Sequence, residues 1–208
     1  MKLDKRLNNY IIIDTETSNN NNYIKEFGYI IYNKKGIAKQ YYCYIDETIA
    51  LENNKTCDDT IQVTPIEQAI NELLDDIQTY NAQVYAYNSS FDYRAINNTL
   101  KAFNSSLSIN QPLDLMGLVS NTIALKKDYI KTCKKNQWFT QKGYVSRTTE
   151  TVYRYISKNY DYIQQHHALD DCIIEMHILE YVRSLRKKPN YTPMHFKTYE
   201  RYCNAISL

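Results

Sequence analysis

Hydrophobic positions recur along the chain with two different periods, which predict strands in some segments and helices in others. Contiguous β-branched residues at 11–13 suit a strand that is buried on both faces. We expect strands near 10–14, 28–33, 38–45, 83–87 and 112–115, and helices near 66–79, near 91–103 and from Ala168 onward. Three successive strands followed by alternating helices and strands predict an α/β fold with a mixed central sheet flanked by helices.

Local signals fix some of the expected boundaries. Pro65 precedes the first apolar position of the helix near 66–79, as is common at helix starts. Ser89 or Ser90 is expected to cap the helix near 91–103. The asparagine tract at 19–22 is expected to form a loop.

Composition limits the classes of protein that need to be considered. The chain has 208 residues, of which 43% are hydrophobic, so it can bury one core and is expected to form a single domain over 1–208. It has no run of about 18 apolar residues and no signal-peptide pattern, so no membrane partner is expected. The five cysteines are scattered and form no Cys-x-x-Cys pair, which favours a reducing, cytoplasmic location over a disulfide framework or a zinc site.

The first candidate site residues follow the apolar strand directly. Asp14 and Glu16 are two residues apart, and side chains at this spacing point to the same face of a strand. Two neighbouring carboxylates repel each other unless a cation lies between them, and carboxylate oxygens suit Mg²⁺ or Mn²⁺. The alternative is a solvated strand end followed by a turn, because Asp-x-Glu is common by chance.

Further candidates lie at the starts of two later helices. Asp92 falls in the first turn of the helix near 91–103, and Asp171 in the first turn of the helix that begins near Ala168. His166 precedes the second helix, and histidine is the natural general base near neutral pH. The alternative is that these acids only balance the helix dipoles, with solvent-exposed histidines beside them.

Taken together, three ordered motifs resemble the DEDDh family of 3′→5′ exonucleases. The family's first motif matches Asp14-Thr-Glu-Thr17, and its second, usually His-Asn-x-x-Phe-Asp, matches Tyr87-Asn-Ser-Ser-Phe-Asp92. Its third, His-x-Ala-x-x-Asp, matches His166-His-Ala-Leu-Asp-Asp171, and Pro112-Leu-Asp-Leu115 resembles a family strand that ends in an aspartate. The resemblance covers about residues 10–182 and implies an RNase H-like fold.

The same resemblance implies an activity and a set of site residues. It implies hydrolysis of phosphodiester bonds at the 3′ end of single-stranded DNA or RNA, with two Mg²⁺ or Mn²⁺ ions per active site. His166 would take the proton from the attacking water. The implied metal ligands are Asp14, Glu16, Asp92 and Asp171. The residues implied to hold the terminal nucleotide are Thr15, Thr17, Asn88 and Phe91.

The chain departs from the family pattern at two places. Tyr87 replaces the usual histidine of the second motif, and Ser18 and the asparagine tract follow Thr17 where the family commonly has Gly-Leu. The apolar wedge under the terminal base is therefore missing there, or comes from Tyr23 or Ile24. In the third motif, only the pair His166 and Asp171 satisfies the family spacing, since Asp170 would place Gln165 at the base position.

Charge is distributed unevenly along the chain. Residues 1–100 carry 9 Lys or Arg against 14 Asp or Glu, whereas residues 101–208 carry 16 against 9. A basic, aromatic insertion at about 125–150 suits single-stranded nucleic acid, or else forms a helical hairpin with a basic face. A basic C-terminal extension at about 187–208 could cover the core or join a homodimer interface.

Two other functions are compatible with these motifs. The first is a catalytically silent exonuclease fold that serves as a binding module, although such modules usually lose at least one acid. The second is a proofreading subunit that acts only within a polymerase complex. The motifs do not distinguish DNA from RNA, because recognition of the 2′-hydroxyl depends on pocket details outside them.

Overall fold

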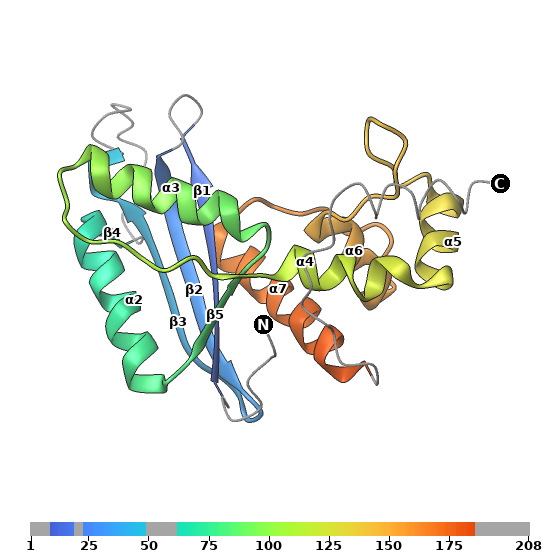
Figure 1. Cartoon of the computed structure of the whole chain (residues 1–208), viewed down its shortest axis with the longest axis horizontal. Helices are drawn as coiled ribbons and strands as arrows, with labels where there is room; N and C mark the ends of the chain where they lie inside the picture. Colours follow the sequence, from blue (N-terminus) through green and yellow to red (C-terminus); the bar gives the residue numbers. More distant parts are fainter. Residues whose placement is uncertain (1–8, 19–22, 49–61, 186–208) are drawn as a thin grey trace. The chain divides into compact units, whose positions relative to one another are not determined.

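A computed structural model describes residues 9–18, 23–48 and 62–185 of the chain, and Figure 1 shows the arrangement of its elements. The chain divides into two compact units. The larger unit contains the described residues up to Asp114, together with Gln165–Ile173. The smaller unit contains Leu115–Gln164 and the described residues from Ile174 onward. The expected insertion at 125–150 lies within the smaller unit, and the expected extension at 187–208 lies outside the described residues.

A six-stranded mixed sheet forms the larger unit, with the strand order β4-β3-β2-β1-β5-β6. β1, β2 and β3 are antiparallel neighbours, whereas β4, β5 and β6 each join a neighbour in parallel. The strands are β1 Asn9–Thr17, β2 Ile24–Asn33, β3 Gly36–Ile45, β4 Val63–Thr64, β5 Gln83–Ala86 and β6 Leu113–Asp114. The predicted meander followed by alternating elements, and with it the mixed α/β class, is confirmed.

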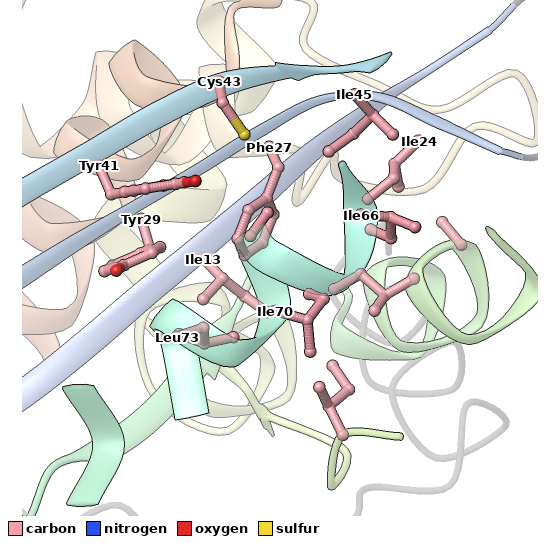
Figure 2. Packing of buried hydrophobic residues seen from close by; sticks show 14 of the residues in the cluster. Ile13, Ile24, Phe27, Tyr29, Tyr41, Cys43, Ile45, Ile66, Ile70 and Leu73 are labelled. Atoms are coloured by element: carbon pink, nitrogen blue, oxygen red, sulfur yellow. The ribbon is translucent and has the colours of Figure 1, made fainter. Parts of the chain in front are cut away.

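Two helices cover one face of this sheet, α2 (Ile66–Tyr80) and α3 (Ser89–Ala102). Alternate residues of β1, including Ile11 and Ile13, point toward these helices and are fully buried. Figure 2 shows Ile13 among aromatic and aliphatic side chains of the neighbouring strands and of α2, such as Phe27 and Ile70. This continuous apolar layer holds the end of β1 in a fixed place.

The smaller unit is helical, with one short hairpin. Its elements are α4 Leu115–Ser120, the 3-10 turn η1 Ile123–Leu125, α5 Lys127–Asn136, α6 Thr149–Ser157 and the later part of α7. α7 (Ala168–Ser184) contributes Ala168–Ile173 to the larger unit. Tyr129 and Tyr155 meet edge to face in the interior, with ring centroids 4.9 Å apart, and the Tyr129 hydroxyl donates to the Ser146 carbonyl at 2.7 Å.

Three details differ from the sequence-based expectations. β2 begins at Ile24 rather than near residue 28, so it continues through Glu26 and Gly28. Neither expected serine caps α3: Asn88 is the N-cap residue and makes no side-chain cap hydrogen bond. The segment 125–150 is not a simple helical hairpin, because a β-bridge between Phe139 and Val145 separates α5 from α6. Among the described residues, no helix is long and apolar enough to cross a membrane.

Candidate active site

The end of β1 presents carboxylates on one face of the sheet and a hydroxyl on the other. Asp14 and Glu16 share a face because they are two residues apart in the strand. Thr15 points to the opposite face, toward α3, and its side chain is buried. The Thr15 hydroxyl donates to Asp92 Oδ1 at 2.9 Å. This hydrogen bond links the first acidic motif to the second.

Asp92 reaches the same region from the first turn of α3. Its side chain is almost fully buried. The turn into α3 passes through Asn88, whose φ of 61° is a left-handed conformation that asparagine tolerates better than most residues. The Ser89 amide, at the start of the helix, donates to Asp114 Oδ1 at 3.4 Å. Asp114, the aspartate at the end of β6, therefore helps to hold the start of the helix that carries Asp92.

Asp171 is brought to the sheet by a close approach of α7 to β2. Gly28 pairs with Asp14 in the strand register, so it lies on the same face as Asp14. A Cβ atom at Gly28 would lie 2.9 Å from the Ala168 carbonyl carbon and 2.9 Å from the Leu169 nitrogen. The Cys172 thiol also donates to the Gly28 carbonyl at 3.4 Å. Glycine at position 28 therefore lets the first turn of α7 rest on the strand opposite Asp14.

Three potential ligand groups converge at this place. The nearest ligand atoms of Glu16, His166 and Asp171 all lie within 4.8 Å of one another. His166 Nδ1 lies 3.8 Å from Glu16 Oε1, and 72% of the His166 side chain is exposed. His166 also has a φ of 54°, an uncommon conformation for a non-glycine residue. The imidazole is thus held beside the carboxylates and is open to solvent.

The neighbouring histidine is held in a different way. The His167 ring lies against Tyr42, with ring centroids 4.4 Å apart, and His167 Nδ1 lies 3.3 Å from Asp170 Oδ2. The Asp171 amide donates to the His167 carbonyl at 3.0 Å, which continues α7 back into the loop. His167 and Asp170 therefore pair with each other, whereas His166 and Asp171 face Glu16.

Burial and mutual repulsion raise the pKa values of the acids in this cluster. Burial, followed by the charges of Asp92, Asp171 and Glu16, raises the pKa of Asp14 well above its usual value. Burial raises the pKa of Asp92 to about 7, against the lowering effect of the Thr15 hydrogen bond. Burial, followed by the charge of Asp171, raises the pKa of Glu16, while His166 opposes that rise. The cluster therefore resists carrying its full negative charge in the absence of a counterion.

This donor set fits a hard divalent cation. Buried carboxylates that raise one another's pKa are stabilised in their charged form when a cation lies among them. Oxygen donors with a single imidazole suit Mg²⁺ or Mn²⁺ better than a soft metal. Glu16 and Asp171 lie close enough together to share one ion, and Asp14 interacts electrostatically with both.

Three residues around the cluster were missed by the sequence analysis. Glu26 pairs with Glu16 in the strand register and accepts a hydrogen bond from the Tyr42 hydroxyl at 3.0 Å. Tyr42 also packs on His167, so it supports the loop that carries His166. Gly28 did carry a signal, because a glycine inside a strand often marks the close approach of another backbone. The signal for Tyr42 and Glu26 was absent, since their roles depend on strand register.

The residues implied to hold the terminal nucleotide lie at the end of β1 and at the start of α3. Thr17 ends β1 and is half-buried, whereas the Thr15 hydroxyl is already used by Asp92. Asn88 is exposed at the start of α3, and the half-buried Phe91 follows in its first turn. A hollow in the surface begins at Phe91 and continues along α3; its lining is Phe91, Arg94, Ala95 and Asn98.

Comparison with known proteins gives a consistent result for the fold. No protein-family model matches the sequence, and no curated protein matches it. The nuclease domain of 3′hExo, a DEDDh family member, bound to rAMP is 14% identical with a TM-score of 0.60, over 92% of this chain and 100% of that one. E. coli exonuclease I in complex with a dA16 oligonucleotide is 13% identical with a TM-score of 0.59, over 86% of this chain but only 41% of that one. Cell-death related nuclease 4 is 14% identical with a TM-score of 0.53, over 88% of this chain and 66% of that one. The chain therefore has the RNase H-like fold of the DEDDh exonucleases, as the sequence motifs implied.

Proposed function

We propose that this protein is a metal-dependent 3′→5′ exonuclease that hydrolyses the terminal phosphodiester bond of single-stranded DNA or RNA. One observation carries the proposal: residues from three separate motifs meet on one end of the sheet. They are Asp14, Glu16, Asp92, His166 and Asp171. The solved structures with a similar fold are exonucleases or nucleases, and this likeness supports the proposal.

In this proposal the acidic residues hold two divalent ions. Asp14, Glu16 and Asp171 would hold the first ion, and Asp14 together with Asp92 would hold the second. Bound Mg²⁺ or Mn²⁺ supplies activation of water and stabilisation of negative charge on the phosphate and on the leaving 3′ oxygen. The raised pKa values of Asp14 and Asp92 support this assignment, because bound cations would stabilise the charged carboxylates.

His166 acts as the general base in this proposal. Its side chain is exposed beside Glu16, so a water molecule in the site can reach the imidazole. The proton passes from water to the neutral imidazole as the oxygen attacks phosphorus, and solvent then removes it. His167 does not take this role, since its ring is engaged with Tyr42 and Asp170.

The 3′-terminal nucleotide is proposed to lie against the ends of β1 and α3. Thr17, Asn88 and Phe91 are candidates for direct contact, and Phe91 borders the hollow on α3. The Thr15 side chain is not a candidate for direct contact, because its buried hydroxyl donates a hydrogen bond to Asp92. We therefore assign the Thr15 side chain to positioning Asp92 and only its backbone to the substrate.

The test is degradation of a 5′-labelled oligonucleotide in the presence of Mn²⁺, with matched single- and double-stranded DNA and RNA. Stepwise shortening of the labelled strand, with release of mononucleotides, is the expected result. A strand whose 3′-terminal linkage is a phosphorothioate should be degraded more slowly, and Asp14→Ala protein should be inactive. Products cut internally, or shortening from the 5′ end of a 3′-labelled strand, would contradict the assigned polarity.

The same assay separates the alternative functions. A catalytically silent binding module would bind the strand without shortening it at any Mn²⁺ concentration. A proofreading subunit would show weak activity alone and would co-purify with a polymerase. The presence of all four acids and of His166 at one end of the sheet favours an enzyme over a silent binding module.

A further inference from the structure

The smaller unit presents aromatic side chains to solvent on its hairpin and beside α6. Among the residues that the structure describes, five large hydrophobic side chains are exposed, and three of them lie in the smaller unit between 139 and 163. Phe139 and Tyr160 are each 42% exposed. The Tyr160 ring meets Trp138 edge to face, with ring centroids 5.7 Å apart. Exposed hydrophobic side chains that gather on one surface mark interaction sites more often than singly exposed ones do.

These rings are held by a fixed framework. The Arg154 guanidinium lies over the Trp138 ring at 5.6 Å and forms an ion pair with Glu150 at 3.0 Å. Arg154 Nε also donates to the Tyr162 carbonyl at 2.6 Å, which ties the segment after α6 to that helix. Phe139 is fixed by the hairpin, in which the Ser146 amide donates to the Trp138 carbonyl at 3.1 Å. The side chains therefore need little ordering when a ligand binds.

The smaller unit also carries an excess of positive charge. Residues 115–164 carry nine Lys or Arg against three Asp or Glu. Lys135 lies in the last turn of α5, three residues before Trp138, Lys142 lies at the tip of the hairpin, and Lys158 lies two residues before Tyr160; all three are exposed. This excess of cations complements a polyanion.

We propose that this aromatic–basic surface, formed by Trp138, Phe139, Arg154, Lys158 and Tyr160, binds a single strand of nucleic acid by base stacking and phosphate contact. The inference rests on the proposed function, and it deepens that function by assigning a second contact region for the substrate. Exposed rings can stack only on bases that are not already paired within a duplex, so a single strand fits better than a duplex. A protein partner would not require the excess of lysine and arginine.

The chain offers a direct probe, because Trp138 is its only tryptophan. Stacking of a base near the Trp138 indole should quench its fluorescence. The titration uses the full chain in EDTA, so that no strand is degraded, with an oligothymidylate of about 15 nucleotides. An abasic strand of equal length and a duplex are titrated in parallel. Thymidylate should quench strongly, while the duplex and the abasic strand should quench much less.

Two variants test the exposed rings while leaving the fluorophore in place. Phe139→Ala and Tyr160→Ala should each weaken binding of the thymidylate strand by about 5- to 150-fold, the range for loss of one stacking platform. Ile37→Ala removes an equally exposed hydrophobic side chain from the larger unit and should leave the affinity unchanged. Replacing Lys135 and Lys142 with Glu should weaken binding and flatten its dependence on salt, since fewer counterions are released.

A small substrate separates this proposal from the proposed activity. With Mn²⁺, hydrolysis of the p-nitrophenyl ester of thymidine monophosphate should be equal in wild-type, Phe139→Ala and Tyr160→Ala proteins, because this substrate has no further bases to stack. Hydrolysis without quenching by oligothymidylate overturns the surface and leaves the activity standing. Equal quenching by the abasic strand, or unchanged affinity in both variants, also overturns it. Binding of a protein instead of any nucleic acid at these residues would do the same.

Discussion

Replacement of Asp92 with asparagine should stabilise the metal-free protein, and increasingly so as the pH rises. Asp92 is 2% exposed, and burial raises its pKa from an ordinary 3.8 to about 7. An acid whose pKa is raised by folding contributes stability that is complete below pH 3.8 and is lost as the pH rises through about 7. The change in pKa corresponds to at most about 4 kcal/mol of unfolding free energy. Asparagine keeps an oxygen that can accept the Thr15 hydrogen bond.

Thermal unfolding of both proteins in EDTA, between about pH 4 and pH 8, measures this effect. The melting temperatures should agree at the acidic end, and the variant should exceed the wild type by up to about 8–16 °C at the alkaline end. The exposed Asp75→Asn is the matched control and should show no such divergence. Addition of Mn²⁺ at about pH 8 should stabilise the wild type more than Asp92→Asn. Parallel pH curves for wild type and variant would refute the reasoning.

Three further predictions follow from the site. Alanine at any of three proposed metal ligands should abolish Mg²⁺-dependent turnover without lowering the metal-free melting temperature. Near-wild-type turnover in one of these variants would show that its residue is not a ligand. The three proposed ligands are Asp14, Glu16 and Asp171. His166→Ala should lower turnover by about 100-fold or more, with a smaller defect at high pH, whereas His167→Ala should cost much less; a pH–rate series on both variants tests this, and the reverse order would show that the register is wrong. Gly28→Ala should lower stability by about 1–3 kcal/mol and weaken Mn²⁺ binding, because its Cβ forces α7 away from β2; calorimetry that finds unchanged metal affinity would restrict Gly28 to a structural role.

Much of the fold follows from local signals in the sequence. The period of apolar residues predicts β1, the helix α2 within one residue of each end, and α7 from its first residue. The same period predicts that His166 precedes α7 and that Asp171 lies in its first turn, as observed. These features were predictable because they depend on residues that are close together in the chain.

Boundaries failed where a local signal was ambiguous. β2 begins four residues earlier than expected, because the charged residues Lys25 and Glu26 interrupt its apolar pattern. The N-cap of α3 falls on Asn88 instead of on a serine, since the chain turns there through a left-handed conformation. Tertiary contacts are involved at both places. The first turn of α7 packs on Gly28, and the Ser89 amide donates a hydrogen bond to Asp114.

The sequence by itself indicated which residues are candidates for the site and in what order they lie, because acids, histidine and turn residues form a recognisable pattern. Only the tertiary structure decided which neighbouring side chains pack against these candidate residues and hydrogen-bond near them. Tyr42 supports His167 and bonds Glu26 beside Glu16 because strand register places it there. Tyr160 meets Trp138 across 22 residues of sequence because α6 lies between them and Arg154 ties both sides. Contacts of this kind depend on the packing of distant segments, which no local pattern of residues encodes.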